Sequence, residues 1–309
     1  MCRVLMYAGE PVCLDDLLYR PNSSLIRQTY QPQMLEMLSL AGFGMLAWDR
    51  ASARPDVPFV YRSIDVPLFD TNLKSLAGKL DVATLLAHVR GVDFEQKPVV
   101  GIENVHPFHY PGYRIALAHN GFLASFERMR FSLLEHVKPE IAQLIRGNTD
   151  SEWIYAVLLS QLPDAKARCT PDEIVAAAER CLSILRDVRR RHDIAISSPV
   201  NLFITDGVSL VAVRFTFDFG CYDYGDIEGI RARNHAYLGA WYTTGHAYGF
   251  KDGEWKMLEA TGDTGGSVLV SSEPLTRDTS TWLEVPEYSA FIASNLEGDR
   301  QRRVHFLDV

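Results

Sequence analysis

The chain has 309 residues, a formal net charge of −8 at pH 7 and 47% hydrophobic residues, which is an ordinary composition for a globular protein with a sizeable core. The acidic balance argues against broad binding of nucleic-acid phosphates, and no apolar stretch is long enough to cross a membrane. The five cysteines show no Cys-x-x-Cys spacing and the N-terminus lacks a signal-peptide pattern, so we expect a reduced, cytoplasmic protein without disulfides or structural zinc.

The first 120 residues contain short apolar segments bounded by Gly, Pro, Asp or Asn, a pattern that predicts strands. The expected strands are Arg3–Ala8, Phe43–Trp48, Phe59–Arg62, Thr84–Arg90 and Arg114–His119.

A helix-rich middle section follows these strands. Thr149 and Glu152 have the spacing of a capping box, as do Thr170 and Glu173, and each pair precedes an apolar pattern that predicts a helix. Cys181 falls on the apolar stripe of the second helix, so we expect its thiol to be packed in the core.

The last third of the chain returns to strands, with a hairpin signal at Asp206-Gly207. The expected strands are Asn201–Thr205, Ser209–Phe217, Ser267–Ser271 and a final strand near Val304–Leu307. Strands, then helices, then strands favour an α+β layered fold over alternating βαβ units. We expect one domain over residues 2–309, with irregular loops in the segment 218–260.

The second residue of the chain is a cysteine, directly before an apolar run. An α-amine has an ordinary pKa of roughly 7.7–8.0, low enough to act as a base near neutral pH. Removal of Met1 would therefore give Cys2 both a thiol and a base, so that one residue supplies a nucleophile and its proton acceptor. The simpler interpretation is an incidental cysteine at a translation start.

An apolar run ends in His88-Val89-Arg90, which places His88 and Arg90 on one face of a strand. An arginine at a strand end is a good fork for a substrate carboxylate, although, taken alone, the pattern favours a surface ion pair. Several histidines lie in this part of the chain, including His106, but their spacing matches no compact metal motif. We therefore expect no metal ion and no cofactor.

Two further stretches hold residue types suited to acyl transfer. Asn120 and Gly121 offer a side-chain and a backbone N–H side by side, as an oxyanion hole requires, although Asn-Gly is also a plain hairpin turn. Asp150 falls in the first turn of a predicted helix, where the helix dipole is sufficient reason for an acid. With a ligand present, the same carboxylate could receive an ammonium group.

The combination and order of these stretches are more specific than any one of them. Met-Cys-Arg at the N-terminus, AHVRG, NVHPFHY, LAHNGF, GNTDSE, NLFITDG and SSEPLT resemble the class II glutamine amidotransferases, which are N-terminal-nucleophile hydrolases. The chain is most similar to the stand-alone branch that includes the fungal glutathione-degrading amidotransferase subunit and the ergothioneine-pathway amidohydrolase. The matching stretches run from residue 2 to about residue 286.

The resemblance implies a four-layer αββα sandwich of two antiparallel sheets covered by helices. It also implies that Cys2 is the nucleophile and that Asn120 and Gly121 form the oxyanion pair. Arg90 would then bind the α-carboxylate of the substrate and Asp150 its α-ammonium group.

In the same comparison, His106 corresponds to a histidine beside the site with a supporting role. The implied reaction is hydrolysis of a γ-glutamyl amide, in glutamine or a γ-glutamyl peptide, through a thioester on Cys2. Two alternatives remain open: a glutaminase subunit that passes ammonia or an acyl fragment to a separate synthetase or peptidase partner, and a catalytically silent regulatory subunit of the same fold. The expected ligand is a small molecule, with no nucleic acid or membrane involved.

Overall fold

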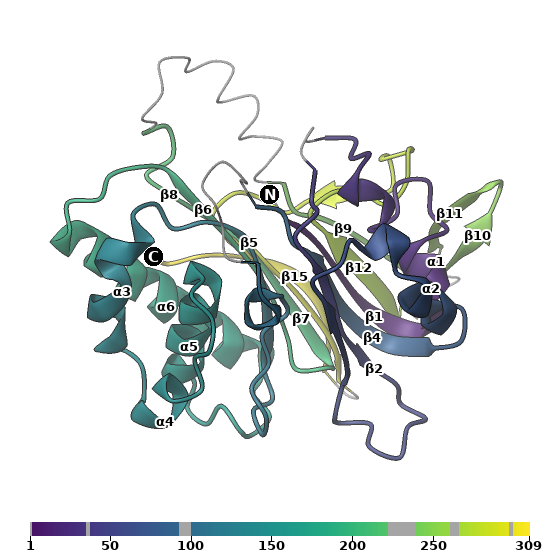
Figure 1. The fold of residues 1–309 in the computed structure, drawn as a ribbon. Helices are drawn as coiled ribbons and strands as arrows, with labels where there is room; N and C mark the ends of the chain where they lie inside the picture. The colour runs from purple at the N-terminus through teal and green to yellow at the C-terminus, as the bar shows by residue number, and fades with distance from the viewer. Residues whose placement is uncertain (1, 35–37, 93–99, 222–238, 260–265, 297–298) are drawn as a thin grey trace.

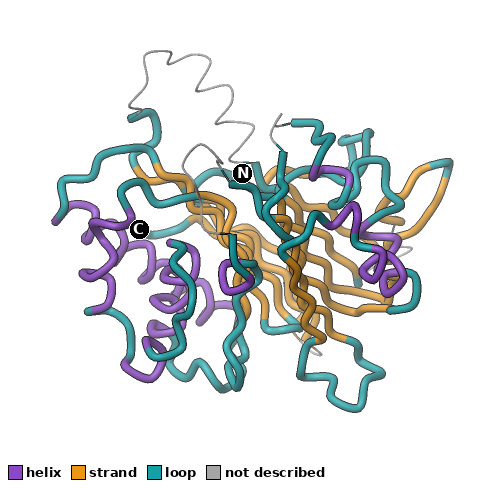
Figure 2. The backbone as a smooth tube through the Cα atoms, in the orientation of Figure 1, coloured by secondary structure: helices purple, strands orange, loops and turns teal. Residues whose placement is uncertain are grey.

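The computed structural model describes residues 2–34, 38–92, 100–221, 239–259, 266–296 and 299–309. Two antiparallel sheets pack face to face, and helices cover the outer faces of both (Figures 1 and 2). This is the four-layer sandwich expected from the resemblance. In the described part of the chain, no helix is long and apolar enough to cross a bilayer.

The first sheet contains the N-terminal strand at its centre. Its strands lie in the order β13 (Leu283–Glu284), β9 (Trp241–Gly245), β12 (Ser267–Ser271), β1 (Arg3–Cys13), β4 (Asp81–Val89), β2 (Phe43–Trp48) and β3 (Phe59–Ser63). The outer face packs against two short helices and a hairpin: α1 (Leu14–Leu18), α2 (Thr71–Ala77), β10 (Ala247–Lys251) and β11 (Glu254–Leu258).

The second sheet carries the larger helical layer. Its strands lie in the order β15 (Asp299–Phe306), β14 (Ser289–Leu296), β7 (Ser209–Arg214), β6 (Ser198–Thr205) and β5 (Ala116–Gly121), and β8 (Thr216–Phe217) also pairs with β6. The helices over its outer face are α3 (Phe126–Leu134), α4 (Pro139–Ala142), α5 (Asp150–Gln161) and α6 (Pro171–Arg191). Short 3-10 turns in the described part of the chain connect other elements: η1 (Arg27–Thr29), η2 (Pro67–Phe69) and η4 (Ile102–Asn104).

Strand alternation decides which residues face the space between the two sheets. On β1, Val4 and Met6 belong to the apolar cluster between the sheets, whereas Leu5 and Tyr7 belong to the cluster under α1 and α2. Both faces of this strand are buried, so its sequence is apolar throughout instead of alternating with polar residues. Because successive side chains of a strand point to opposite faces, the same alternation determines which polar side chains near the strand end can face the space between the sheets.

Most predicted strands are confirmed, and β2 and β12 have the predicted bounds. Asn120 and Gly121 are the last two residues of β5 and pair with Asn201 and Val200 of β6, so the alternative of a hairpin turn at Asn-Gly is wrong. The expectation of irregular loops over 218–260 is wrong for 241–258, which form three strands, while 222–238 lie outside the described residues.

The two predicted helix caps differ in the structure. Thr170 and Glu173 form a complete capping box, in which each side chain binds the backbone of the other residue. Thr149 accepts a hydrogen bond from the backbone N–H of Glu152, but the Glu152 carboxylate accepts from the backbone of Gly147 at 2.6 Å instead. The second half of this predicted box is therefore replaced by a contact that holds the preceding loop against α5. Cys181 is fully buried, as predicted.

Candidate active site

Cys2 lies immediately before β1, beside the end of β4. Strand register pairs Arg3 with Val89, so the residues that follow β4 are the neighbours of Cys2. The Cys2 thiol donates a long hydrogen bond to the backbone oxygen of Gly91, with Sγ and O 3.6 Å apart. The side chain is half-buried and reduced, so a thiol lies next to the Arg90-Gly91 peptide.

Arg90 is buried and its backbone is anchored to the strand on the other side. Its N–H donates to Gly42 O at 2.8 Å, and its carbonyl accepts from Ala41 N at 2.9 Å. Burial lowers the pKa of Arg90 below its ordinary value, while the nearby Cys2 and Asp150 groups act in the opposite direction. The guanidinium therefore lies within electrostatic range of both the thiol and the carboxylate.

Asp150 begins α5 and joins this helix to the loop after β5. Its Oδ2 accepts from the backbone N–H of Leu123 at 2.7 Å, and its Oδ1 accepts from the Ser151 hydroxyl at 3.1 Å. Leu123 follows Gly121 by two residues. One carboxylate thus connects the start of the helix to the end of the strand that carries Asn120.

Asn120 faces the central space between the sheets. Ala116 and Ala118 belong to the cluster between the sheets, and the period of two places Asn120 on the same side. The side chain is buried, and its Oδ1 has no hydrogen-bond partner among the described residues. A buried amide oxygen without a partner is uncommon in a purely structural position.

Gly121 is required by packing. A Cβ atom there would lie 1.9 Å from the backbone oxygen of Pro199 on the neighbouring strand, a distance that no side chain tolerates. This close approach of the two strands requires a glycine at position 121 whether or not the residue has a role in binding.

Buried histidines pack beneath the predicted site. His106 stacks on His88 with ring centroids 4.1 Å apart, and both rings are almost fully buried. Burial, with the nearby Arg90 charge, lowers the pKa of His88 to about 3, and burial also lowers the pKa of His106. Both imidazoles are therefore neutral near pH 7 and unsuited to act as a general base there.

His119 points to the other face of β5, and its Nδ1 lies 2.8 Å from the hydroxyl of Ser151. Within the described residues, no group of three or more His, Cys, Asp or Glu side chains has the arrangement of a metal site.

Reasoning from the sequence missed a buried ion pair behind Cys2. Arg3 donates from Nη1 to the carbonyl of Cys2 at 3.1 Å, and its Nε lies 3.7 Å from Oε2 of Glu273. Both side chains are almost fully buried. Glu273 belongs to the SSEPLT stretch that carries the resemblance, so the signal was present, but nothing in the sequence connected it to Arg3.

The six predicted residues therefore gather at one end of the sandwich, where β1, β4 and β5 meet the start of α5. They are Cys2, Arg90, His106, Asn120, Gly121 and Asp150. A thiol, a buried cation, an anchored carboxylate and a buried amide at one location have the groups needed to bind a zwitterion and attack a carbonyl carbon.

Comparison with known proteins defines the class first. The model of the family described as glutamine amidotransferases class-II matches residues 67–219. Over these residues the chain is similar to that family.

The chain is also 28% identical to a yeast protein, the probable glutamine amidotransferase DUG3 of Saccharomyces cerevisiae, over 94% of this chain and 80% of that protein. Among solved structures, the glutamine aminotransferase class-II domain protein of Silicibacter pomeroyi superposes with a TM-score of 0.57 at 19% identity, covering 98% of both chains. The glutamine phosphoribosylpyrophosphate amidotransferase of B. subtilis gives 0.56 at 15% identity, covering 99% of this chain and 49% of that one. At these identities the two structures establish a shared fold.

Proposed function

We propose that this protein hydrolyses the amide bond of a γ-glutamyl compound, with Cys2 as the nucleophile. The observation that carries the proposal is the contact between the Cys2 thiol and the peptide after Arg90, 3.6 Å from Sγ to Gly91 O. A carboxylate-binding cation beside a terminal thiol suits a substrate whose acid group lies a short distance from the bond to be broken.

The glutamyl part of the substrate would be recognised through its two charged groups. The guanidinium of Arg90 would bind the α-carboxylate through two parallel hydrogen bonds. Asp150 would receive the α-ammonium group. Among the described residues its Oδ2 accepts one hydrogen bond, from Leu123 N, and its Oδ1 accepts one, from the Ser151 hydroxyl, so each oxygen retains a further lone pair. The γ-carbonyl would then extend toward Cys2.

The reaction begins after Met1, which lies outside the described residues, has been removed. The α-amine of Cys2 takes the thiol proton while the sulfur attacks the γ-carbonyl carbon, and N–H groups of Asn120 and Gly121 stabilise the oxyanion. The intermediate collapses to a γ-glutamyl thioester, and the protonated α-amine gives its proton to the departing amine. A water molecule, deprotonated by the same α-amine, then hydrolyses the thioester and releases glutamate and the thiol.

The proposal also states which γ-glutamyl compounds are candidate substrates. The groups described above contact the glutamate portion, so glutamine and γ-glutamyl peptides such as glutathione are both candidate substrates. A thiol nucleophile works in its reduced form, which fits the cytoplasmic location expected from the cysteine pattern.

The test is glutamate release by the pure protein from glutamine, γ-glutamylcysteine and glutathione. The Cys2→Ala variant should lose activity by a factor of about 10⁴ or more, as removal of a nucleophile does, and should keep its melting temperature because the thiol is half-buried at a strand end. Cys13→Ala, which removes another half-buried thiol, is the matched control and should retain activity.

Intact-mass measurement after incubation with a glutamine-like diazo ketone gives an independent readout. The proposal expects loss of Met1 and one adduct that Cys2→Ala abolishes. Retained Met1 with no adduct and no glutamate release would favour the silent subunit instead, and activity only on addition of a second protein would favour the partner-dependent glutaminase.

A further inference from the structure

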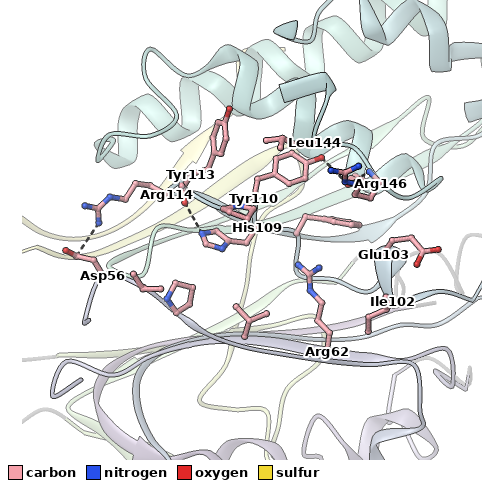
Figure 3. Close-up of a pocket in the computed structure, with 17 residues that line it drawn as sticks. Asp56, Arg62, Ile102, Glu103, His109, Tyr110, Tyr113, Arg114, Leu144 and Arg146 are labelled. Atoms are coloured by element: carbon pink, nitrogen blue, oxygen red, sulfur yellow. Dashed lines mark hydrogen bonds and ion pairs between the residues drawn. The ribbon is translucent and has the colours of Figure 1, made fainter. Parts of the chain in front are cut away.

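A cavity of about 850 Å³ lies beside β3 and β5, the edge strands of the two sheets, and none of the six predicted site residues lines it. Its walls come from the approach to β3, from η4, from the segment 108–114 and from the chain after α4 (Figure 3). A volume of this size is ordinary for a small-molecule site, roughly 300–1,000 Å³.

Most of the cavity wall is apolar or aromatic. Val60, Phe108 and Leu144 contribute aliphatic and aromatic surface, and Tyr110 and Tyr113 add two more rings. The two tyrosine rings meet edge to face, with centroids 6.2 Å apart. Such a lining suits the apolar body of a ligand.

Arg62 brings a positive charge into this apolar lining. Its side chain extends from β3 into the cavity (Figure 3). The Nη2 group of Arg62 donates a hydrogen bond to the backbone oxygen of Pro107 at 2.5 Å. The buried Nε of Arg62 has no partner within the described part of the chain. Burial lowers the pKa of Arg62 below its ordinary value, although the charges of Tyr155 and Glu152 act in the opposite direction. Burial therefore outweighs the compensation that these neighbours give to the cation.

Two acids of the cavity wall are already committed to other groups. Asp56 pairs with Arg114 at 3.2 Å and with Arg168 at 3.4 Å. Glu152 accepts from the Tyr110 hydroxyl at 3.1 Å and from the backbone before α5. Glu103 also lines the wall, but the ion pairs found between described side chains do not join it to Arg62. The guanidinium of Arg62 therefore remains able to bind an external acid.

We propose that this cavity is a second binding site, separate from the Cys2 site, for a small organic acid with an apolar or aromatic body. The acid group binds the guanidinium of Arg62, and the body packs against Val60, Phe108 and Leu144. Binding removes the cost of an unmatched charge in an apolar wall, since a buried ion is stabilised by a partner of opposite sign.

The experiment uses 3-phenylpropionate and its uncharged amide as probes, with binding to the full chain followed by ligand-observed NMR. The acid should bind about tenfold or more tightly than the amide, because hydrogen bonds to a charged group contribute more than neutral ones. Arg62→Gln should abolish this difference. Equal binding of acid and amide, or no binding of the acid at roughly 10 mM, would overturn the proposal.

Two further variants test whether the acid binds in this cavity. Arg54→Gln removes an exposed arginine from the loop before β3, outside the cavity wall, and should leave binding of the acid unchanged. Leu144→Trp should fill the apolar end and weaken acid and amide alike, which tests the cavity without altering Arg62.

Arg90→Gln separates this site from the proposed catalytic one. It should not change binding of 3-phenylpropionate. A loss of binding in Arg90→Gln, with Arg62→Gln unaffected, would place the acid at the Cys2 site and refute the second site, whatever the outcome of the hydrolysis assays.

Discussion

The carbonyl of Cys2 accepts a hydrogen bond from Arg3, and Arg3 lies against Glu273 in a buried ion pair. Oε1 of Glu273 also accepts from the backbone N–H of Gln33 at 2.6 Å. At the scale of single residues, the backbone of Cys2 is therefore held by the side chain of Arg3, which is itself paired with a buried acid. Removing one member of a buried pair leaves an uncompensated charge, so this arrangement has little tolerance for change.

Glu273→Gln tests whether this pair positions Cys2, the proposed nucleophile. The kcat for glutamate release should fall by about tenfold to a hundredfold, because small displacements of a reacting group cost that much. The KM should change little, since Arg90 and Asp150 are the groups proposed to bind the substrate. Steady-state kinetics on glutamine, together with the melting temperature of each variant, provide the measurement.

Glu284→Gln is the matched control, because Glu284 pairs at 2.8 Å with another buried arginine, Arg214, away from Cys2. It should leave kcat unchanged. A normal kcat in Glu273→Gln, or a rise in KM alone, would mean that the pair has no positioning role.

At the scale of elements, the site depends on the junction between the end of β5 and the start of α5. Asp150 joins the two through Leu123 N. The loop before the helix is held by Glu152, whose carboxylate accepts from the backbone of Gly147 at 2.6 Å and Arg146 at 3.0 Å. The strand that carries Asn120 and the start of α5 are therefore joined by hydrogen bonds.

Gly121→Ala should break this junction. The added Cβ would meet the backbone oxygen of Pro199 at 1.9 Å, so the two strands must separate, and we expect a loss of about 1–3 kcal/mol in the free energy of unfolding, as other overpacked sites show. Urea unfolding followed by circular dichroism measures the loss.

Gly78→Ala is the control at this scale. Its nearest atom to a new Cβ lies 3.8 Å away and its φ of −76° suits any residue, so its stability should be close to that of the natural chain. Equal stability of the two variants would show that β5 and β6 can separate at this point without cost.

At the scale of the whole molecule, the sandwich encloses titratable groups in its interior. His88 and His106 stack on each other and are almost fully buried, and His119 is also buried with its pKa lowered by burial. In the unfolded chain each of these imidazoles regains an ordinary pKa of about 6.5. The unfolded state therefore binds protons at pH values where the folded state does not.

The fold should accordingly lose stability in mild acid. For His88, the stabilisation is complete above about pH 6.5 and is lost as the pH falls toward the folded pKa of about 3. The slope should be about 1.4 kcal/mol per pH unit for each histidine that stays neutral in the folded state. Urea unfolding at a series of pH values between 7.5 and about 4.5 gives this slope.

A histidine variant identifies the source of the slope. His88→Gln should lower the slope of the unfolding free energy against pH by the contribution of one histidine. His246→Gln, which replaces an exposed histidine, should leave the slope unchanged. A stability that does not depend on pH over this range would contradict the assignment of neutral, buried imidazoles.

The local sequence determined several features of this protein. Apolar runs bounded by turn residues predicted β2 and β12 with their observed bounds, and Thr170 with Glu173 marked the start of α6. The motif set resembles that of the class II glutamine amidotransferases, and this resemblance implied the four layers. The strand bounds and the helix start follow from residues close together in the chain, where periodicity and capping chemistry act directly.

Only the tertiary structure decided what those residues contact. The pairing of Arg3 with Glu273 joins positions 270 residues apart in the numbering, and the stacking of His106 on His88 joins a loop to a strand. Asn-Gly in β5 became a strand end because β6 supplied a partner for both residues. Such contacts arise from strand register and from two sheets closing on each other, and neither is encoded in the spacing of neighbouring side chains.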